Sequence, residues 1–259
     1  MKRHILIILF SFLTVAPGFA WGPKGHRIVA QVAYNHLTRK AQRSVDAVLG
    51  KHGIIYWSTW PDEIKSDEKV YPTSYDWHFQ DLDANMTDSA VIAVLTDYPT
   101  HGGNLYRMTD SLINALKKNP YDADALVFIV HLTGDRFCPM HMGHEHDRGG
   151  NSVRCKWFES STNLHSIWDV SLIEYKGYSY SEYARYLEDK LSGQREKIIA
   201  MTPEELIVHN YHLTDAIYKY QKKWDNNAYH YAYYWSQHME WQLYAAGIRL
   251  AQLLNEIYR

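Results

Sequence analysis

Apolar residues recur at helical spacing along most of the chain, and this periodicity restricts the possible folds more than any other feature. One apolar face near the N-terminus consists of Ile28, Val29, Val32, Ala33 and Leu37. The same spacing predicts helices over 105–116, 123–137, 166–175, 181–191, 203–220 and 228–257. No segment alternates convincingly between apolar and polar residues in the way that predicts a strand. We therefore expect an all-α protein.

Residues 21–259 contain no repeat, low-complexity tract or linker, so the sequence predicts one domain after residue 20. The length of the chain and its 46% of hydrophobic residues suffice for one sizeable core. Short loops separate the helices, and one long loop is expected over about 141–164. We expect a helical globule whose active site is formed by facing helices and by that loop.

The first twenty residues form a separate segment. It has a basic start at Lys2 and Arg3, an apolar run over 5–15, and small residues that lead to Ala20. This pattern indicates a secretory signal peptide that is cleaved before Trp21. The apolar run is about half of the roughly 20 residues that a membrane-spanning helix needs. We expect a secreted or periplasmic protein without a retained membrane anchor.

The charge balance is mildly acidic. The chain has 27 Lys and Arg residues against 29 Asp and Glu residues, and removing Lys2 and Arg3 lowers the net charge from −2 to −4. Such a chain has no polybasic surface with which to hold nucleic acid. If it binds phosphates, bound cations are needed to supply the positive charge. Fifteen histidines make metal binding worth testing.

The two cysteines, Cys138 and Cys155, would meet oxidising conditions after export. We expect a disulfide between them. The alternative is two buried free thiols, while a pair of cysteines does not complete a zinc site.

Two histidine and aspartate pairs share one spacing. His131 precedes Asp135 by four residues, and His165 precedes Asp169 by four residues. On a helix this spacing places both side chains on one face, about one turn apart, where they can share a metal ion. His141 follows the first pair closely. This combination is hard to explain as a chance arrangement of exposed residues.

Further candidate ligands lie upstream. Asp62 and His78 each lie in a segment rich in aromatic residues, and His26 lies five residues after the new N-terminus at Trp21. A free α-amine has a pKa of about 8, so the amine of Trp21 can lose its proton and bind a metal near neutral pH. Removal of the signal peptide would then create a ligand.

Six motifs together resemble the zinc-dependent single-strand nucleases of moulds and plants, which belong to the superfamily of trinuclear-zinc nucleases and phospholipases C. They are Trp-Gly-x-x-Gly-His at 21–26, Trp-Pro-Asp-x-x-Lys at 60–65, Trp-His-Phe-x-Asp at 77–81, His-x-x-Gly-Asp-x-x-x-Pro-x-His at 131–141, Gly-Gly-Asn at 149–151 and Asn-Leu-His-x-x-Trp-Asp at 163–169. They occur in the order of that family and cover roughly residues 21–175.

The resemblance implies three Zn²⁺ ions at the base of a cleft. The first zinc is held by the residues that match Asp62, His78, His131 and Asp135. The second is held by those that match His141, His165 and Asp169. The third takes the amine and carbonyl of Trp21, with His26 and the other oxygen of Asp135. Asp135 would therefore bridge two metal ions.

The resemblance also implies an activity, that of an endonuclease and 3′-nucleotidase. It would cut RNA and single-stranded DNA into products with 5′-phosphates, and we expect it to be a monomer. Asp62, Lys65 and Asn151 would be catalytic, with Lys65 against the phosphoryl oxygens and Asn151 donating a hydrogen bond to them.

Phe79 and Asp81 match the residues that bind a base in that family. Phe79 would stack on the base and Asp81 would accept hydrogen bonds from its edge, which favours single strands. The alternative is that Phe79 is a core residue and Asp81 a turn residue.

Two other functions remain as alternatives. A zinc phospholipase C shares much of this constellation, but Glu ends its last ligand pair, so Asp169 favours the nuclease. A zinc-storage protein would not need Lys65 and Asn151 beside the metals. The loop that follows His141 contains His144 and His146, which do not match the motif, and we expect them to be solvated.

Overall fold

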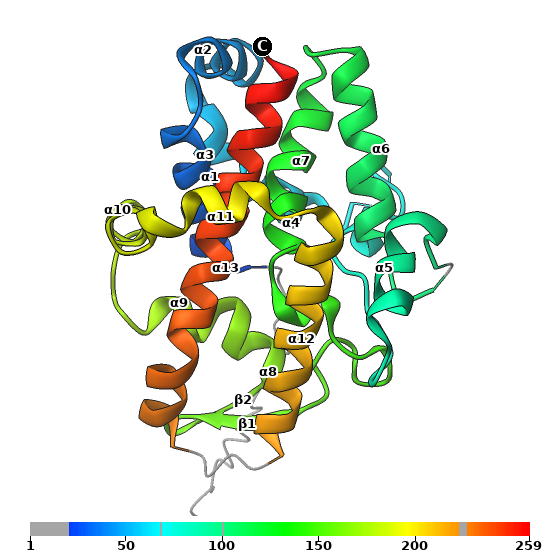
Figure 1. Ribbon diagram of the computed structural model, residues 1–259, viewed down its shortest axis with the longest axis vertical. Helices are drawn as coiled ribbons and strands as arrows, with labels where there is room; N and C mark the ends of the chain where they lie inside the picture. The colour runs from blue at the N-terminus through cyan, green and yellow to red at the C-terminus, as the bar shows by residue number, and fades with distance from the viewer. Residues whose placement is uncertain (1–20, 68, 100, 223–226) are drawn as a thin grey trace, which may run out of the picture.

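Three helices from distant parts of the sequence pack together at the centre of the computed structural model (Figure 1): α1 (Pro23–Asn35), α7 (Ala123–Asp135) and α13 (Ala228–Ile257). The structure describes residues 21–67, 69–99, 101–222 and 227–259. The predicted signal segment, 1–20, lies outside these residues. Among the described residues no helix is both long and apolar enough to cross a membrane, including the 30-residue α13.

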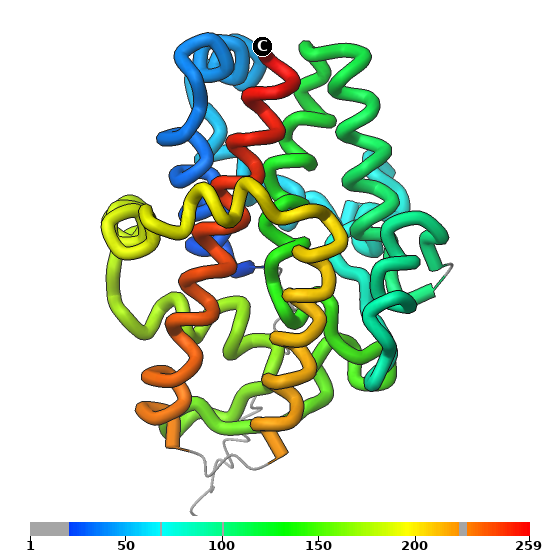
Figure 2. The backbone as a smooth tube through the Cα atoms, viewed as in Figure 1, coloured from blue at the N-terminus to red at the C-terminus, as the bar shows by residue number. Residues whose placement is uncertain are grey.

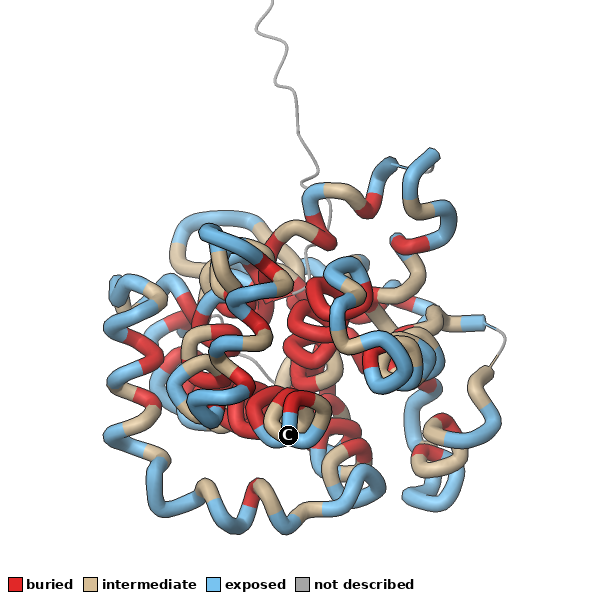
Figure 3. Tube along the Cα trace, turned by 90° about the horizontal axis from the view of Figure 1, so that it is seen from above, coloured by how far each residue is buried: buried red, intermediate tan, exposed pale blue. Residues whose placement is uncertain are grey.

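The other helices surround these three and confirm the all-α fold class. They are α2 (Arg39–Leu49), α3 (Gly53–Trp57), α4 (Trp60–Ile64), α5 (Asp88–Asp97), α6 (Leu105–Lys118), α8 (Leu164–Ser166), α9 (Leu172–Glu174), α10 (Tyr180–Leu191), α11 (Arg195–Ala200) and α12 (Pro203–Gln221). Seen from above, the buried segments lie in the middle and the exposed ones along the rim (Figure 3). The chain therefore has one main core, formed around α1 and α13.

Helix α7 carries ligand candidates because its sequence keeps it inside the protein. The side chain of Asp122 caps its N-terminus by accepting a hydrogen bond from the amide of Ala125. Every residue from Ala125 to Asp135 is buried, as expected for a helix that is apolar on nearly all sides. His131 and Asp135 are thus held in the interior and not on the surface.

The long loop expected over 141–164 contains a two-stranded hairpin, so the expectation of no strands was wrong here. Strand β1 (Arg154–Trp157) pairs antiparallel with β2 (Ser160–Asn163). Phe158, in the turn between them, has a positive φ of 52°. Strand β1, Arg-Cys-Lys-Trp, alternates polar and apolar residues over only four positions, and β2, Ser-Ser-Thr-Asn, contains no apolar residue, so the pair gives a weak strand signal. The hairpin matters for the site because β2 ends at Asn163, whose side chain caps α8 just before His165.

The helix predicted over 166–175 is present but irregular. Its central part, η5 (Ile167–Ser171), is a π-helical turn between α8 and α9 and contains Asp169. Single π turns inside α-helices are frequently found at functional sites. Here the turn changes the helical spacing around Asp169.

The predicted disulfide is not present in the structure, in which both cysteines are free thiols. Cys138 is fully buried and its Sγ donates a hydrogen bond to Oδ1 of Asp169, at 3.1 Å. Cys155 lies on β1, opposite Thr162. The folded chain thus directs Cys138 toward the ligand candidate Asp169.

Candidate metal centre

His26, from the first turn of α1, lies against α7. Its ring stacks on that of His131, with 3.7 Å between centroids and 14° between planes. Its Nε2 atom is 3.3 Å from Oδ1 of Asp135. The packing of α1 on α7 therefore brings His26 to His131 and Asp135, which lie more than 100 residues further along the chain.

Two short segments add Asp62 and His78. Asp62 lies in α4, and His78 follows the turn η2 (Ser74–Trp77). Nδ1 of His78 is 3.2 Å from Oδ2 of Asp135 and 3.0 Å from Nε2 of His131. Nε2 of His131 is also 3.7 Å from Oδ1 of Asp62. These side chains and His26 form one buried group.

A second group forms where η3 (Pro139–Met142) meets the helix around Asp169. Nε2 of His165 is 2.8 Å from Oδ2 of Asp169, and Nε2 of His141 is 3.9 Å from the same oxygen. Nδ1 of His141 is 3.8 Å from Oδ1 of Asp135. Asp135 therefore lies near both groups. Within the first group its two oxygens face His26 and His78, which is the arrangement expected of the predicted bridge.

Backbone carbonyl groups fix the orientation of three of the rings. Nδ1 of His131 donates to the carbonyl of Ser58 at 2.7 Å, and Nδ1 of His165 donates to that of Gly149 at 2.6 Å. Nδ1 of His141 donates to the carbonyl of His78. A carbonyl oxygen can only accept, so each Nδ1 carries a proton, and Nε2 is the ring nitrogen left for a metal ion. This is the usual arrangement behind metal-binding histidines.

Several buried polar atoms of these side chains have no hydrogen-bond partner. They are both ring nitrogens of His26, Nε2 of His78, Nε2 of His141, Oδ2 of Asp62, Oδ1 of Asp135 and Oδ2 of Asp169. A buried polar atom without a partner costs about 1–3 kcal/mol. So many buried polar atoms without a partner in one place fit a site for divalent cations. Within each group of candidate ligands, the ligand atoms lie within 4.8 Å of one another. Imidazole and carboxylate donors suit zinc.

The pKa values of four ligand candidates favour the protonation states that metal ligands need, whereas two others are shifted the opposite way. Burial lowers the pKa of His78 to about 4 and also lowers that of His26, so both rings are neutral at pH 7. Burial alone would raise the pKa of Asp135 and of Asp169. The neighbouring histidines outweigh it, bringing that of Asp169 to about 2 and that of Asp135 well below its usual range. Both carboxylates are therefore ionised.

Burial would lower the pKa of His141, but Asp135 and Asp169 outweigh it and raise that pKa to about 9, and Asp135 and Asp62 likewise raise the pKa of the buried His131. These two rings would release a proton on binding a metal ion.

Trp21 begins the described chain and is fully buried. In the view of Figure 2, the blue N-terminal segment that contains α1 passes near the middle of the molecule. The indole Nε1 of Trp21 donates to the carbonyl of Gly134 at 2.8 Å, and the amide of Gly22 donates to the carbonyl of Asp169 at 2.8 Å. A Cβ at Gly25 would lie 2.8 Å from Cβ of Trp21. The first residues are thus packed between the two ligand groups.

A cleft of about 710 Å³ opens above the two groups. Its lining includes Lys65, His78, Phe79, Asp81, His141, Asn151 and His165. Nζ of Lys65 is 3.0 Å from Oδ1 of Asp62, and both side chains are buried. Asn151 donates to the carbonyl of Arg148 at 2.9 Å. The structure thus brings the predicted catalytic residues to the same cleft as the candidate ligands.

Phe79 and Asp81 also line this cleft. Phe79 is half-buried and makes an edge-to-face contact with Tyr75, at 5.9 Å between centroids. Burial raises the pKa of Asp81 to about 7, although His165 and His141 lower it. The carboxyl group of Asp81 is therefore close to half ionised at neutral pH.

Sequence reasoning did not find several residues of the cleft, namely Tyr75, His101, Asn104, Glu145, Arg148 and Arg154. No spacing in the sequence connects them with the ligands. The hairpin brings Arg154 to the cleft, and a hairpin was not expected. Arg148 precedes Gly149-Gly150, which is the signal that could have identified it.

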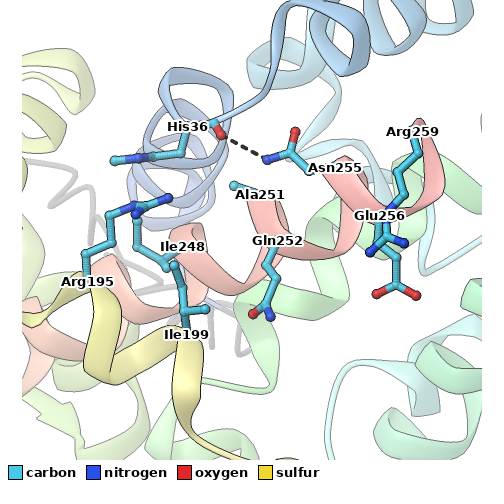
Figure 4. A pocket seen from close by; sticks show the side chains of 9 residues that line it. All are labelled: His36, Arg195, Ile199, Ile248, Ala251, Gln252, Asn255, Glu256 and Arg259. Atoms are coloured by element: carbon cyan, nitrogen blue, oxygen red, sulfur yellow. Dashed lines mark hydrogen bonds between the residues drawn. The ribbon is translucent and has the colours of Figure 1, made fainter.

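A second pocket, of about 240 Å³, lies away from the ligands, between the end of α1, α11 and the last turns of α13 (Figure 4). His36 and Arg195 face it, and Asn255 donates to the carbonyl of His36 at 3.0 Å. None of the predicted site residues lines it. The cleft above the ligand groups is therefore the candidate site.

A helical domain with two buried histidine and aspartate groups below a cleft is typical of one class of protein, that of the metal-dependent hydrolases. Within that class the chain belongs to the S1/P1 nuclease family, because the model described as S1/P1 Nuclease matches residues 21–259. This family is metal-dependent. The resemblance recognised in the six motifs is thereby confirmed.

Similar proteins include plant and fungal nucleases. Endonuclease 2 of Arabidopsis thaliana is 27% identical over 187 residues, which cover 66% of this chain and 62% of that protein. Nuclease S1 of Aspergillus oryzae is 28% identical over 197 residues, which cover 73% of this chain and 67% of the relative. Nuclease P1 of Penicillium citrinum is 27% identical over 156 residues, which cover 58% and 57%. The chain thus spans less than two thirds of the plant relatives it matches.

Proposed function

We propose that this chain is a zinc-dependent endonuclease and 3′-nucleotidase that hydrolyses RNA and single-stranded DNA to products with 5′-phosphates. The observation that carries the proposal is the buried Asp135, whose two oxygens face His26 and His78 beneath a cleft that is lined by His78, His141 and His165. The names of the relatives, Nuclease S1 and Nuclease P1, support nucleic acid as the substrate.

The proposed cofactor is three Zn²⁺ ions. Asp62, His78, His131 and Asp135 would hold one, and His141, His165 and Asp169 another. Trp21, His26 and Asp135 would hold the third. The membership of His131 in two neighbouring groups of ligand atoms supports closely spaced ions. The nitrogen donors favour zinc over magnesium or calcium, which prefer oxygen.

Bound zinc would supply the positive charge and the Lewis acidity that hydrolysis of a phosphodiester requires. Lys65 would add a positive charge at the cleft floor, where its ammonium lies beside Asp62. Asn151, which also lines the cleft, would hydrogen-bond to the phosphoryl oxygens. The side chains of Lys65 and Asn151 lie in the cleft beside the ligands. There they could stabilise the negative charge that builds up on the phosphoryl oxygens in the transition state.

Phe79 and Asp81 would bind the base. A half-buried aromatic ring at the edge of a cleft can stack on a base only when that base is not paired and stacked within a duplex. Tyr75 supports the ring of Phe79 from its edge. This arrangement favours single strands without a strict sequence requirement.

Export with cleavage between Ala20 and Trp21, and a monomeric state, are part of the same proposal. The burial of Trp21 beside Gly134 supports the cleavage position, because a new amine at Trp21 would lie inside the protein and near His26. An α-amine with a pKa of about 8 can act as a ligand near neutral pH.

The test uses the purified chain that begins at Trp21. It should cut single-stranded DNA and RNA faster than duplex DNA, and end-group analysis should find 5′-phosphates. His165→Asn should lose this activity, while the exposed His212→Asn should retain it. Hydrolysis of a choline phospholipid without cleavage of nucleic acid would instead support a phospholipase C. Retained zinc without turnover on any phosphoester would support a storage protein.

A further inference from the structure

Three more potential metal ligands meet outside the metal centre, on the loop that follows η3. They are His144, His146 and Asp147, and one ligand atom from each lies within 4.8 Å of the other two. His144 and Asp147 are buried, whereas the side chain of His146 is 75% exposed. The expectation of two solvated histidines is therefore correct for His146 and wrong for His144.

Packing against α12 fixes two of these three side chains. The ring of His144 stacks on that of Tyr218, with 3.9 Å between centroids and 15° between planes. Oδ1 of Asp147 accepts hydrogen bonds from the hydroxyl of Tyr218 at 2.8 Å and from the amide of Gly150 at 2.7 Å. The other oxygen, Oδ2, faces Nε2 of His146 at 3.8 Å. Packing thus holds the side chains of His144 and Asp147 in place, whereas the exposed side chain of His146 can change its rotamer.

We propose that His144, His146 and Asp147 form a fourth metal site, which takes a zinc-like divalent cation. At metal–ligand distances of 2.0–2.2 Å, the ligand atoms of a tetrahedral site lie about 3.4 Å apart. Nε2 of His146 is already 3.8 Å from Oδ2 of Asp147, and rotation of the exposed His146 side chain can shorten this distance. Two imidazoles and one carboxylate suit Zn²⁺ and not Ca²⁺ or Mg²⁺, and water would complete the coordination. Burial lowers the pKa of His144, which keeps its ring neutral as a ligand requires.

The site would act on the loop that forms one wall of the cleft. The carbonyl of Gly149 accepts the hydrogen bond from Nδ1 of His165, at 2.6 Å. Gly149 has a φ of +61°, and a Cβ there would lie 2.5 Å from the carbonyl oxygen of Met140, so only glycine fits. A cation bound to His144, His146 and Asp147 would stiffen the start of this loop, which Tyr218 of α12 already anchors, and would thereby help to hold Gly149 in place. The inference goes beyond the nuclease activity and does not depend on it.

The test counts bound metal by equilibrium dialysis of the intact chain against micromolar Zn²⁺, followed by elemental analysis. His146→Asn should bind one equivalent fewer than the unchanged chain. His144→Phe should lose the same equivalent while keeping the ring stack on Tyr218. The control is His212→Asn, since His212 is exposed and faces a single carboxylate, that of Asp88, at 2.9 Å. It should bind as much zinc as the unchanged chain.

Equal zinc binding by the unchanged chain and by His146→Asn would overturn the proposal. So would an equal loss in His212→Asn, because the extra zinc would then lie elsewhere. Dialysis against Ca²⁺ should add no equivalent at this site, and a calcium ion lost in His146→Asn would overturn the assignment to a zinc-like cation. The result depends only on the difference between variants, so it stands even if the chain cleaves no nucleic acid.

Discussion

The Nε2 atom of His26 lies 3.3 Å from Oδ1 of Asp135, and both side chains are fully buried. These two residues come from α1 and α7, which pack against each other in the core. Oδ2 of the same carboxylate is 3.2 Å from Nδ1 of His78. The two oxygens of Asp135 therefore face different histidines, which is the arrangement that a bridge between two cations needs.

Asp135→Asn should lower both bound zinc and activity. The amide keeps the shape of the side chain but removes the negative charge near the two ligand groups. We expect the loss of at least one zinc per chain and a fall in kcat of ~100-fold or more, since changes behind the ligands alone cost 10–100-fold. Elemental analysis measures the bound zinc, and cleavage of single-stranded DNA measures kcat. Asp110→Asn, which removes a partly exposed partner of Arg136, is the control. Unchanged zinc in Asp135→Asn would contradict the bridge.

The N-terminus provides a second test. A form with one extra residue before Trp21 has no α-amine at this buried position, whereas the form that begins at Trp21 has one. We expect the extended form to bind about one zinc fewer and to lose most of its activity, because the amine, with a pKa of about 8, would be replaced by an amide. If both forms bind equal zinc and cut equally fast, Trp21 is not a ligand.

Cys138 should act by holding Asp169. Its thiol donates to Oδ1 of Asp169, and burial raises the pKa of the thiol well above its usual range, which keeps the proton in place. Cys138→Ser keeps a donor and should retain zinc, whereas Cys138→Ala should weaken zinc binding by about 10–100-fold. Competition with a chelator measures the affinity of each variant for zinc.

Cys138 and Cys155 should both be free thiols. Two reactive thiols per denatured chain should be found without a reductant, and their absence would support the disulfide between Cys138 and Cys155.

Phe79→Ala should weaken substrate binding without removing metal. The half-buried ring lines the cleft but is not among the candidate ligands. Stacking on one base contributes about 1–3 kcal/mol, so KM for single-stranded DNA should rise by roughly 5–150-fold while bound zinc is unchanged. Phe79→Tyr, which keeps an aromatic ring, should restore most of the affinity. Loss of zinc in Phe79→Ala would show instead that the ring supports the fold.

Asp81 should make the metal-free chain less stable as the pH rises. Burial raises the pKa of Asp81 to about 7 in the folded chain, while an unfolded Asp has a pKa of about 3.9. Between these values the folded chain holds a proton that the unfolded chain has lost, so the free energy of unfolding falls as the pH increases. Asp81→Asn removes this dependence.

After allowance for solvent around this half-buried group, the advantage of Asp81→Asn should grow by about 2 kcal/mol between about pH 5 and pH 8. Urea unfolding of both chains at the two pH values measures it. A constant difference would mean that Asp81 has an ordinary pKa.

The sequence predicted the long helices well, because their periodicity extends over several turns. The helix expected over 228–257 is α13 with the same bounds, and that expected over 203–220 ends one residue later. The short elements α3, α4 and α11 were not predicted, since five or six residues do not establish a helical period. The longer helices α2 and α5 were also missed. The hairpin was missed because β1 alternates over only four residues and β2 contains no apolar residue.

By itself the sequence determined the helical architecture, the order of the motifs and the residue types able to bind metal. These depend on local spacing, which each segment carries independently. Only the tertiary structure decided that His26 lies against Asp135 and that Cys138 faces Asp169 instead of Cys155. It also brought His144 under Tyr218. Such contacts join residues far apart in the chain, and they depend on how α1, α7 and α12 pack, which no local pattern specifies.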